Sequence, residues 1–309
     1  MTMLTHNNQG IQKKFVLSII LTSLILAAEI IGGIWSGSLA LLSDAAHVFS
    51  DVFALALSYF ALRLAMRPPD DQHSYGWHRA EVLAALVNGV SLLVIAIGIW
   101  VESFKRWQNP VEIRSMEMMI IAVIGLAVNV AVALILGGHD HHHNELEIHQ
   151  EKTRNLNVQS AFLHVLGDLI SSIGVIIAAI LIRITSASWI DPLISVIIGV
   201  IILVSAYRVT RKALHILVEG VPEGMSIKKI NKAMRSIPAV DTVHDLHVWN
   251  LSSENISLSA HVVLSSGNTQ PPEQVMGQIK ALLESEFDIH HTTLQFENVP
   301  CGDGHGGCN

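Results

Sequence analysis

The chain has 309 residues, half of them apolar and 15% charged, whereas a soluble domain usually carries about 25% charged residues. The formal net charge of −7 gives no basic surface for nucleic acid. The sequence holds no Gly-x-x-x-x-Gly-Lys-Ser/Thr loop for ATP and no nucleophile constellation, so we expect neither an ATP-driven protein nor an enzyme. The shortage of charge lies between Phe15 and Tyr207, which predicts a membrane part followed by a soluble part.

Six segments are long and apolar enough to cross a bilayer, which takes about 20 residues. We therefore predict a cytoplasmic tail over residues 1–14 and an all-α bundle of six transmembrane helices within residues 15–212. The predicted spans are Phe15–Trp35, Leu39–Met66, Ala80–Phe104, Met116–Leu136, Asn155–Ile184 and Ile190–Tyr207.

Basic residues predict the orientation of these spans. The segments on the side of the two termini carry ten Lys and Arg residues, and those on the opposite side carry four. Because basic residues are enriched in cytoplasmic segments, we expect both termini in the cytoplasm. We also expect a multi-pass protein of the plasma (inner) membrane.

The second and fifth spans each contain a His-x-x-x-Asp motif, formed by His47 and Asp51 and by His164 and Asp168. Residues four apart lie on one face of a helix, so two packed helices would bring together two nitrogens and two oxygens. That set suits a tetrahedral Zn²⁺ site, and a divalent cation would offset the cost of acids within the bilayer. The alternative is that each pair is a local hydrogen bond that shapes the bundle.

A His-rich loop, residues 137–153, follows the fourth span and is predicted to face the cytoplasm. One interpretation is a mobile segment that collects Zn²⁺ near the transport path, and the other is a low-complexity linker. Its leading candidates for metal binding are His139, His141, His142 and His143.

Residues 213–299 read as a soluble α+β domain with the order α-β-β-α-β, which suits a ferredoxin-like fold. Ser226 is predicted to cap a helix that ends near Ile237. The remaining predicted elements are strands Val240–Leu251 and Asn255–Leu264, helix Pro272–Glu286 and strand Thr292–Val299.

This soluble domain contains candidate ligands for a regulatory metal site, namely His244, His247, His261 and Glu297, with Asp245 nearby. Alternation along the second strand sends His261 to the face opposite the apolar residues, where it is available to a ligand.

The Gly-rich tail, residues 300–309, holds both cysteines of the chain. Cys301, His305 and Cys308 are a possible tail site, although ordering such a segment costs much conformational entropy. Two cysteines in this setting predict no disulfide framework.

Several motifs together resemble the cation diffusion facilitator family, in its zinc-transporter branch, over Phe15 to Val299. The resemblance implies a homodimer and exchange of metal for protons, with His47, Asp51, His164 and Asp168 as the metal site. The residues that carry it are Gly-Ser-Leu-Ala-Leu-Leu-Ser-Asp-Ala-Ala-His at 37–47, Tyr-Gly-Trp-His-Arg-Ala-Glu at 75–81, His-Val-Leu-Gly-Asp at 164–168, Asp191-Pro192 and His-Asp-Leu-His-Val-Trp at 244–249.

The resemblance also bears on the choice of metal and counter-ion. Histidine at position 47 goes with a preference for zinc in the family, and imidazoles suit Zn²⁺ better than Mg²⁺ or Mn²⁺; cadmium and cobalt are further candidates. Histidine must be neutral to bind metal, so we expect His47 and His164 to carry the counter-moving protons.

Two further sites are implied by resemblance. Some family members bind a second metal in the loop that here holds Asp70, His73 and His78, but this chain has Trp77 where one ligand would stand. The alternative is a solvated interfacial loop. Members also place zinc ligands at positions resembling His244, His261 and Glu297, whereas Gln295 replaces a histidine of some relatives, which argues against a binuclear site.

Two rival functions remain at this stage. One is a membrane-bound metal sensor, although the sequence contains no kinase, DNA-binding or other output module. The other is a passive metal channel without proton coupling. A flux measurement in vesicles distinguishes both from an antiporter.

Overall fold

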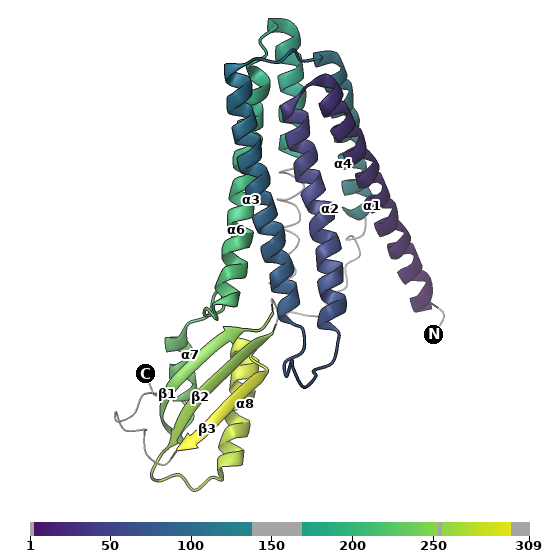
Figure 1. Ribbon diagram of the computed structural model, residues 1–309. Coiled ribbons are helices and arrows are strands. Elements are labelled where there is room, and N and C mark those ends of the chain that lie inside the picture. The colour runs from purple at the N-terminus through teal and green to yellow at the C-terminus, as the bar shows by residue number, and fades with distance from the viewer. Residues whose placement is uncertain (1–2, 138–168, 253–254, 298–309) are drawn as a thin grey trace. The chain divides into compact units, whose positions relative to one another are not determined.

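The computed structural model describes residues 3–137, 169–252 and 255–297 (Figure 1). It divides into two compact units, of which the first comprises Met1–Ala56 and Asn88–Tyr207 and the second comprises Leu57–Val87 and Arg208–Asn309. The residues of the predicted loop 137–153 beyond Gly137 and of the predicted tail 300–309 lie outside the described residues.

Long helices form most of the described residues before Leu217. Within the described residues, α2, α3 and α6 are long and apolar enough to cross a membrane, and three shorter apolar helices accompany them: Ile20–Ser36, Ser115–Ala131 and Leu169–Thr185. The predicted fifth span is described only from Leu169 onward. The labelled helices are α1 (Met3–Ser36), α2 (Leu39–Ala65), α3 (Arg79–Gln108), α4 (Ser115–Gly137) and α6 (Ile190–Leu217).

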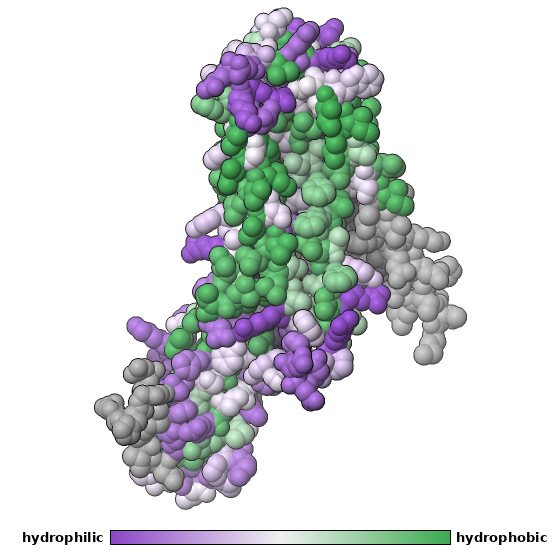
Figure 2. Space-filling model, viewed as in Figure 1, coloured by the Kyte–Doolittle hydropathy of each residue, from purple (hydrophilic) through white to green (hydrophobic). Residues whose placement is uncertain are grey.

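The first unit buries several small residues between its helices and leaves many large apolar residues exposed. Ala40, Ala96, Ala178 and Ala179 are fully buried, and α1 packs along α4. Close packing through small residues is typical of membrane helices, whose large side chains face lipid. Figure 2 shows a hydrophobic surface over the helices. The exposed large apolar residues of this unit include Leu24, Ile31, Ile34, Val94, Phe104 and Ile184.

The start of α2 is held by a residue from the start of α6. The buried Asp191 carboxylate accepts hydrogen bonds from the Ser38 hydroxyl at 2.6 Å and from the backbone N–H groups of Leu39 at 2.8 Å and Ala40 at 3.1 Å. These N–H groups have no partner within their own helix. Asp191 therefore caps α2 in the way that a residue just before the helix usually does.

The C-terminal part contains a mixed three-stranded sheet in the order β1-β2-β3. β1 and β2 are antiparallel, and β2 and β3 are parallel, as their connection through α8 allows. The core includes the fully buried Ile230, Leu258, Val262, Ile279 and Leu283. The elements are α7 (Ile227–Met234), β1 (Val240–Asn250), β2 (Ile256–Leu264), α8 (Pro272–Phe287) and β3 (His291–Glu297).

The element order agrees with the predicted α-β-β-α-β arrangement. One local detail of that prediction is wrong: Ser226 occupies the N-cap position of α7, but its side chain makes no capping hydrogen bond. α7 also ends at Met234, before the predicted Ile237. The helix depends instead on packing, since its apolar side chains Ile230 and Met234 are buried.

Candidate metal centres

The His-x-x-x-Asp motif of the second span lies on α2, where His47 and Asp51 are partly buried. Asp44 precedes them by three and seven residues, so all three share one face of the helix. His164 and Asp168 lie outside the described residues, so the structure describes half of the predicted transport site.

Asp44 links this face of α2 to the helix Leu169–Thr185. The residue is 2% exposed, and its carboxylate accepts hydrogen bonds from the hydroxyls of Ser171 at 2.6 Å and Ser172 at 3.0 Å. Asp191, which follows that helix in the chain, contacts the first residues of α2. The two helices are therefore antiparallel, and Asp44 is a polar residue of this region that our motif analysis missed.

A second centre lies on the C-terminal sheet and joins three of the residues expected to bind a regulatory metal. His261 Nδ1 lies 3.0 Å from Glu297 Oε1, and His244 Nε2 lies 3.2 Å from Glu297 Oε2. One ligand atom of each residue falls within 4.8 Å of the others, and all three residues are partly buried. Two imidazoles and a carboxylate leave the fourth position of a tetrahedral zinc site for water or another ligand.

The register of the sheet explains why these residues meet. His244 on β1 is paired with His261 on β2, and His261 is paired with Gln295 on β3. Glu297 lies two residues beyond Gln295, so it points to the same face. The predicted alternation of β2 thus places His261 correctly.

The strand β1 is irregular next to this row. The pairing shifts between His244 and His247, and Asp245 has a positive φ of 49°, a backbone conformation that Asp adopts more readily than most residues. Asp245 contacts His247 Nε2 at 2.9 Å and His261 Nε2 at 3.6 Å. His247 is the more exposed histidine and lies outside the three-donor group.

Gln295, which stands where some relatives have a histidine ligand, contacts Glu297. Its amide N–H donates to Glu297 Oε1 at 2.8 Å. A hydrogen bond of this kind fixes the orientation of a metal-binding carboxylate. Sequence reasoning compared Gln295 with a histidine and overlooked that the two-residue spacing to Glu297 permits this contact.

The loop before α3 is held by local hydrogen bonds. The Asp70 carboxylate accepts from the backbone N–H groups of Gln72 and His73, and it lies 3.0 Å from His73 Nδ1. The Gln72 N–H, followed by the His73 side chain, lowers the pKa of the Asp70 carboxyl. Among the described residues, Asp70, His73 and His78 do not form a compact three-donor group.

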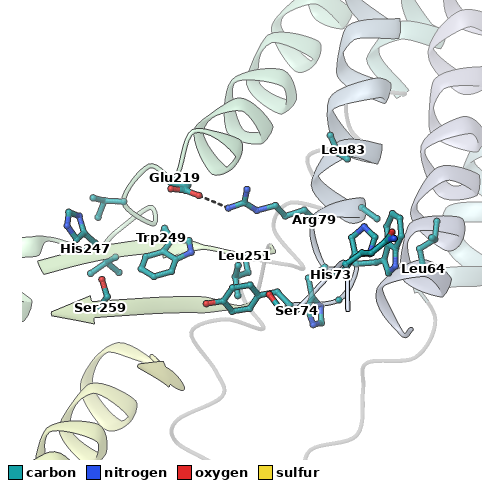
Figure 3. Close-up of a pocket in the computed structure, with 18 of the residues that line it drawn as sticks. Leu64, His73, Ser74, Arg79, Leu83, Glu219, His247, Trp249, Leu251 and Ser259 are labelled. Carbon is teal, nitrogen blue, oxygen red and sulfur yellow. Dashed lines mark hydrogen bonds and ion pairs between the residues drawn. The ribbon is translucent and has the colours of Figure 1, made fainter. Parts of the chain in front are cut away.

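A cavity of about 980 Å³ in the second unit is lined by this loop and by β1. The Arg79 guanidinium donates to Glu219 at 2.8 Å beside it, and His73 and His247 lie at opposite ends (Figure 3). Among the described residues, neither histidine belongs to a compact group of three donors. The candidate metal ligands of the His-rich loop and of the tail lie outside the described residues. They are His139, His141, His142 and His143 in the loop, and Cys301, His305 and Cys308 in the tail.

Comparison with protein families gives two matches that together cover most of the chain. The family model described as the cation efflux transmembrane domain matches residues 15–218, and that described as the cation efflux protein, cytoplasmic domain, matches residues 222–299.

Individual relatives are similar over nearly the whole chain. The identity is 37% over 293 residues to the metal cation efflux system protein CzcD of Cupriavidus metallidurans, covering 94% of this chain and 88% of that protein. It is 37% over 297 residues to the cadmium, cobalt and zinc/H(+)-K(+) antiporter of Bacillus subtilis, covering 94% and 91%. It is 37% over 281 residues to the zinc transporter ZitB of Escherichia coli, covering 91% and 85%.

One solved structure is the metal-bound C-terminal domain of the CzcD transporter from Cuprividus metallidurans. The match to this structure has 37% sequence identity and a TM-score of 0.22. It covers 24% of this chain and 99% of the chain in the solved structure.

Proposed function

Since this chain belongs to the cation diffusion facilitator family of metal cation efflux proteins, we propose that it exports Zn²⁺ from the cytoplasm in exchange for protons. As a member of this family, the chain is a multi-pass membrane transporter with a helical transmembrane domain and a cytoplasmic domain. The cytoplasmic domain contains a small mixed sheet. Cd²⁺ and Co²⁺ are further candidates for cargo, because they appear with zinc in the name of the Bacillus subtilis relative.

The contact between Asp44 and the hydroxyls of Ser171 and Ser172 is the observation that supports the transport site best. In an antiparallel pair of helices, moving a number of residues forward along one helix corresponds to moving the same number of residues backward along the other helix. His47 and Asp51 come three and seven residues after Asp44.

The same steps taken back from Ser171 lead to Asp168 and His164. If the predicted fifth span continues as a helix before Leu169, Asp168 lies at the level of His47, and His164 lies at the level of Asp51. The register thus favours a site of two imidazoles and two carboxylates over two separate local pairs.

Zinc chemistry suits such a site. Zn²⁺ prefers four ligands in tetrahedral geometry and accepts both imidazole and carboxylate. Imidazole binds metal only when neutral, so cation binding displaces protons near physiological pH. His47 and His164 are the groups proposed to carry the counter-moving protons.

The remaining parts of the proposal concern assembly and regulation. We propose six spans, cytoplasmic termini, an inner-membrane location and a homodimer, for which the matched cytoplasmic domain of the family gives support. The three-donor centre of His244, His261 and Glu297 serves as a regulatory zinc site, and the His-rich loop collects metal on the cytoplasmic side.

Zinc uptake into proteoliposomes with an acidic lumen tests the transport site. The wild type should accumulate Zn²⁺ in proportion to the imposed proton gradient, and Asp51→Ala should abolish this uptake because the site loses a charged ligand. Asp241→Ala is the matched control, since Asp241 is an exposed acid on β1, and it should transport normally. Equal uptake by Asp51→Ala would remove this site from the mechanism.

The same assay separates the rival functions. A passive channel would equilibrate Zn²⁺ at the same rate with or without the proton gradient. A sensor would bind Zn²⁺ without moving it across the membrane. Gradient-dependent uptake is expected of the antiporter and of neither rival.

A further inference from the structure

Glu29 is an acidic side chain within α1 that the proposed transport site does not use. It is 0% exposed, and neither carboxyl oxygen has a hydrogen-bond partner within the part of the chain that the structure describes. Gly125 of α4 provides the space for it, because a Cβ atom at Gly125 would lie 2.5 Å from Glu29 Oε1. The carboxyl group is therefore enclosed between α1 and α4.

The surroundings of Glu29 are unsuited to a negative charge. Ile25, one turn earlier on α1, is buried beside Gly125. On the described part of α4, the acidic residue is Glu117, more than two turns before Gly125. A carboxylate that lacks both water and hydrogen-bond donors is costly within a membrane, and protonation removes that cost.

Asp44 of α2 is an acid whose charge acts on that of Glu29. Asp44 accepts hydrogen bonds from Ser171 and Ser172, so its negative charge is stabilised by donors and that of Glu29 is not. Two nearby acids of this kind ionise unequally. The proton is expected on Glu29.

A metal ion fits this position poorly. Zn²⁺ needs about four ligands, and among the described residues Glu29 belongs to no compact group of three donors. A proton needs a single oxygen. The position of Asp44, one turn before His47 on the same face of α2, connects Glu29 electrostatically with the proposed transport site.

We propose that Glu29 is an additional proton-binding site in the membrane domain, separate from the histidines of the transport site. The inference rests on the proposed function. With the transport site empty, Glu29 is a neutral carboxylic acid. When a divalent cation enters the transport site, the O–H bond of Glu29 breaks, the proton is released from the membrane domain to the bulk solvent, and the carboxylate remains to balance the charge of the cation.

Infrared spectroscopy of the full-length protein in detergent tests the protonation directly. The wild type without zinc should show the C=O stretching band of a protonated carboxyl group near neutral pH, and saturating Zn²⁺ should remove it. Glu29→Gln should lack this band, and Glu112→Gln, which changes an exposed acid between α3 and α4, should retain it. If Glu29→Gln fails to fold, Glu29→Asp should shift the band.

Several outcomes would overturn the inference: no such band in the wild type, the same band in Glu29→Gln, an unshifted band in Glu29→Asp, or a band that Zn²⁺ leaves unchanged. Proton release on zinc binding gives a second measure, and Glu29→Gln should release about one proton fewer per protomer than the wild type. If zinc flux by the wild type does not depend on the proton gradient, the proposed antiport is rejected instead. That result is independent of the infrared band.

Discussion

At the scale of single residues, hydrogen-bond donors distinguish acids that look alike in the sequence. Asp44 has two serine hydroxyls and Glu29 has no described donor. Glu297 is oriented by Gln295 and faces two imidazoles. The roles of these acids therefore depend on neighbours that come from other segments of the chain.

Gln295 is predicted to raise the zinc affinity of the C-terminal centre without binding the ion. In full-length protein that carries Asp51→Ala to remove the transport site, Gln295→Leu should weaken zinc binding about 10–100-fold, because Glu297 loses the group that orients it. Competition with a chromogenic chelator measures this affinity. Gln278→Leu, at an exposed position on α8, should leave it unchanged, and an equal loss in both variants would contradict the positioning role.

The serine next to Asp44 is predicted to stabilise the membrane domain. Ser171→Ala should lower the free energy of unfolding by about 1.5–3 kcal/mol, since a hydrogen bond to a buried charged group is lost. Denaturant unfolding in detergent measures the change. Ser205→Ala, at an exposed position on α6, should be nearly neutral; a neutral Ser171→Ala would mean that Asp44 finds another donor or is uncharged.

At the scale of elements, the connection between α1 and α2 is defined by both backbone and side chains. Gly37 has φ of 75°, and its carbonyl oxygen accepts a hydrogen bond from Arg106 of α3. Asp191 caps the helix that follows. The position of α2, and therefore of His47 and Asp51, depends on this connection.

Alanine at Gly37 is predicted to be harmful, and alanine at Gly98 is the matched control. At Gly37 the backbone conformation favours glycine, and a Cβ atom would lie 3.0 Å from the Glu112 carbonyl oxygen. We expect a loss of about 1–2 kcal/mol. At Gly98, in α3, no atom lies within 4 Å of an added Cβ, so Gly98→Ala should be neutral or stabilising by up to about 1 kcal/mol. Unfolding in detergent compares the two, and equal effects would argue against this conformation of Gly37.

The sequence was informative where a pattern is local. Apolar length predicted the positions of α2, α3 and α4, and alternation predicted β1, β2 and the row that contains His244 and His261, because periodicity depends only on nearby residues. Contacts between distant segments carry no such signal. Asp191 caps α2, and serine hydroxyls contact Asp44; both contacts join residues more than 120 positions apart. The sequence motifs therefore included Asp191 and Asp44 but did not predict which residues they contact.

At the scale of the whole molecule, the described residues of the two proposed metal centres belong to different compact units. Asp51 lies in the first unit, whereas His244, His261 and Glu297 lie in the second. They share no ligand, so each centre is expected to lose its ion independently of the other.

Zinc content should reflect this separation. Metal analysis of purified protein at saturating Zn²⁺ should show one ion fewer per protomer in Asp51→Ala, one fewer in His261→Ala and two fewer in the double variant, because binding at independent sites is additive. His290→Ala, an exposed histidine of the same domain, should keep the wild-type content. A double variant that equals either single variant would mean that the two sets of residues bind one ion together.

The attachment of α2 to Asp191 has a mechanical consequence. A helix held at its first residues can tilt only about that point, so displacement grows with distance along it. α2 spans Leu39–Ala65, about 39 Å at 1.5 Å per residue. A tilt of about 5° would then shift His47 by about 1 Å but Ala65 by about 3 Å. The attachment at Asp191 thus predicts that a tilt of α2 moves the proposed ligands His47 and Asp51 less than it moves the far end of the helix.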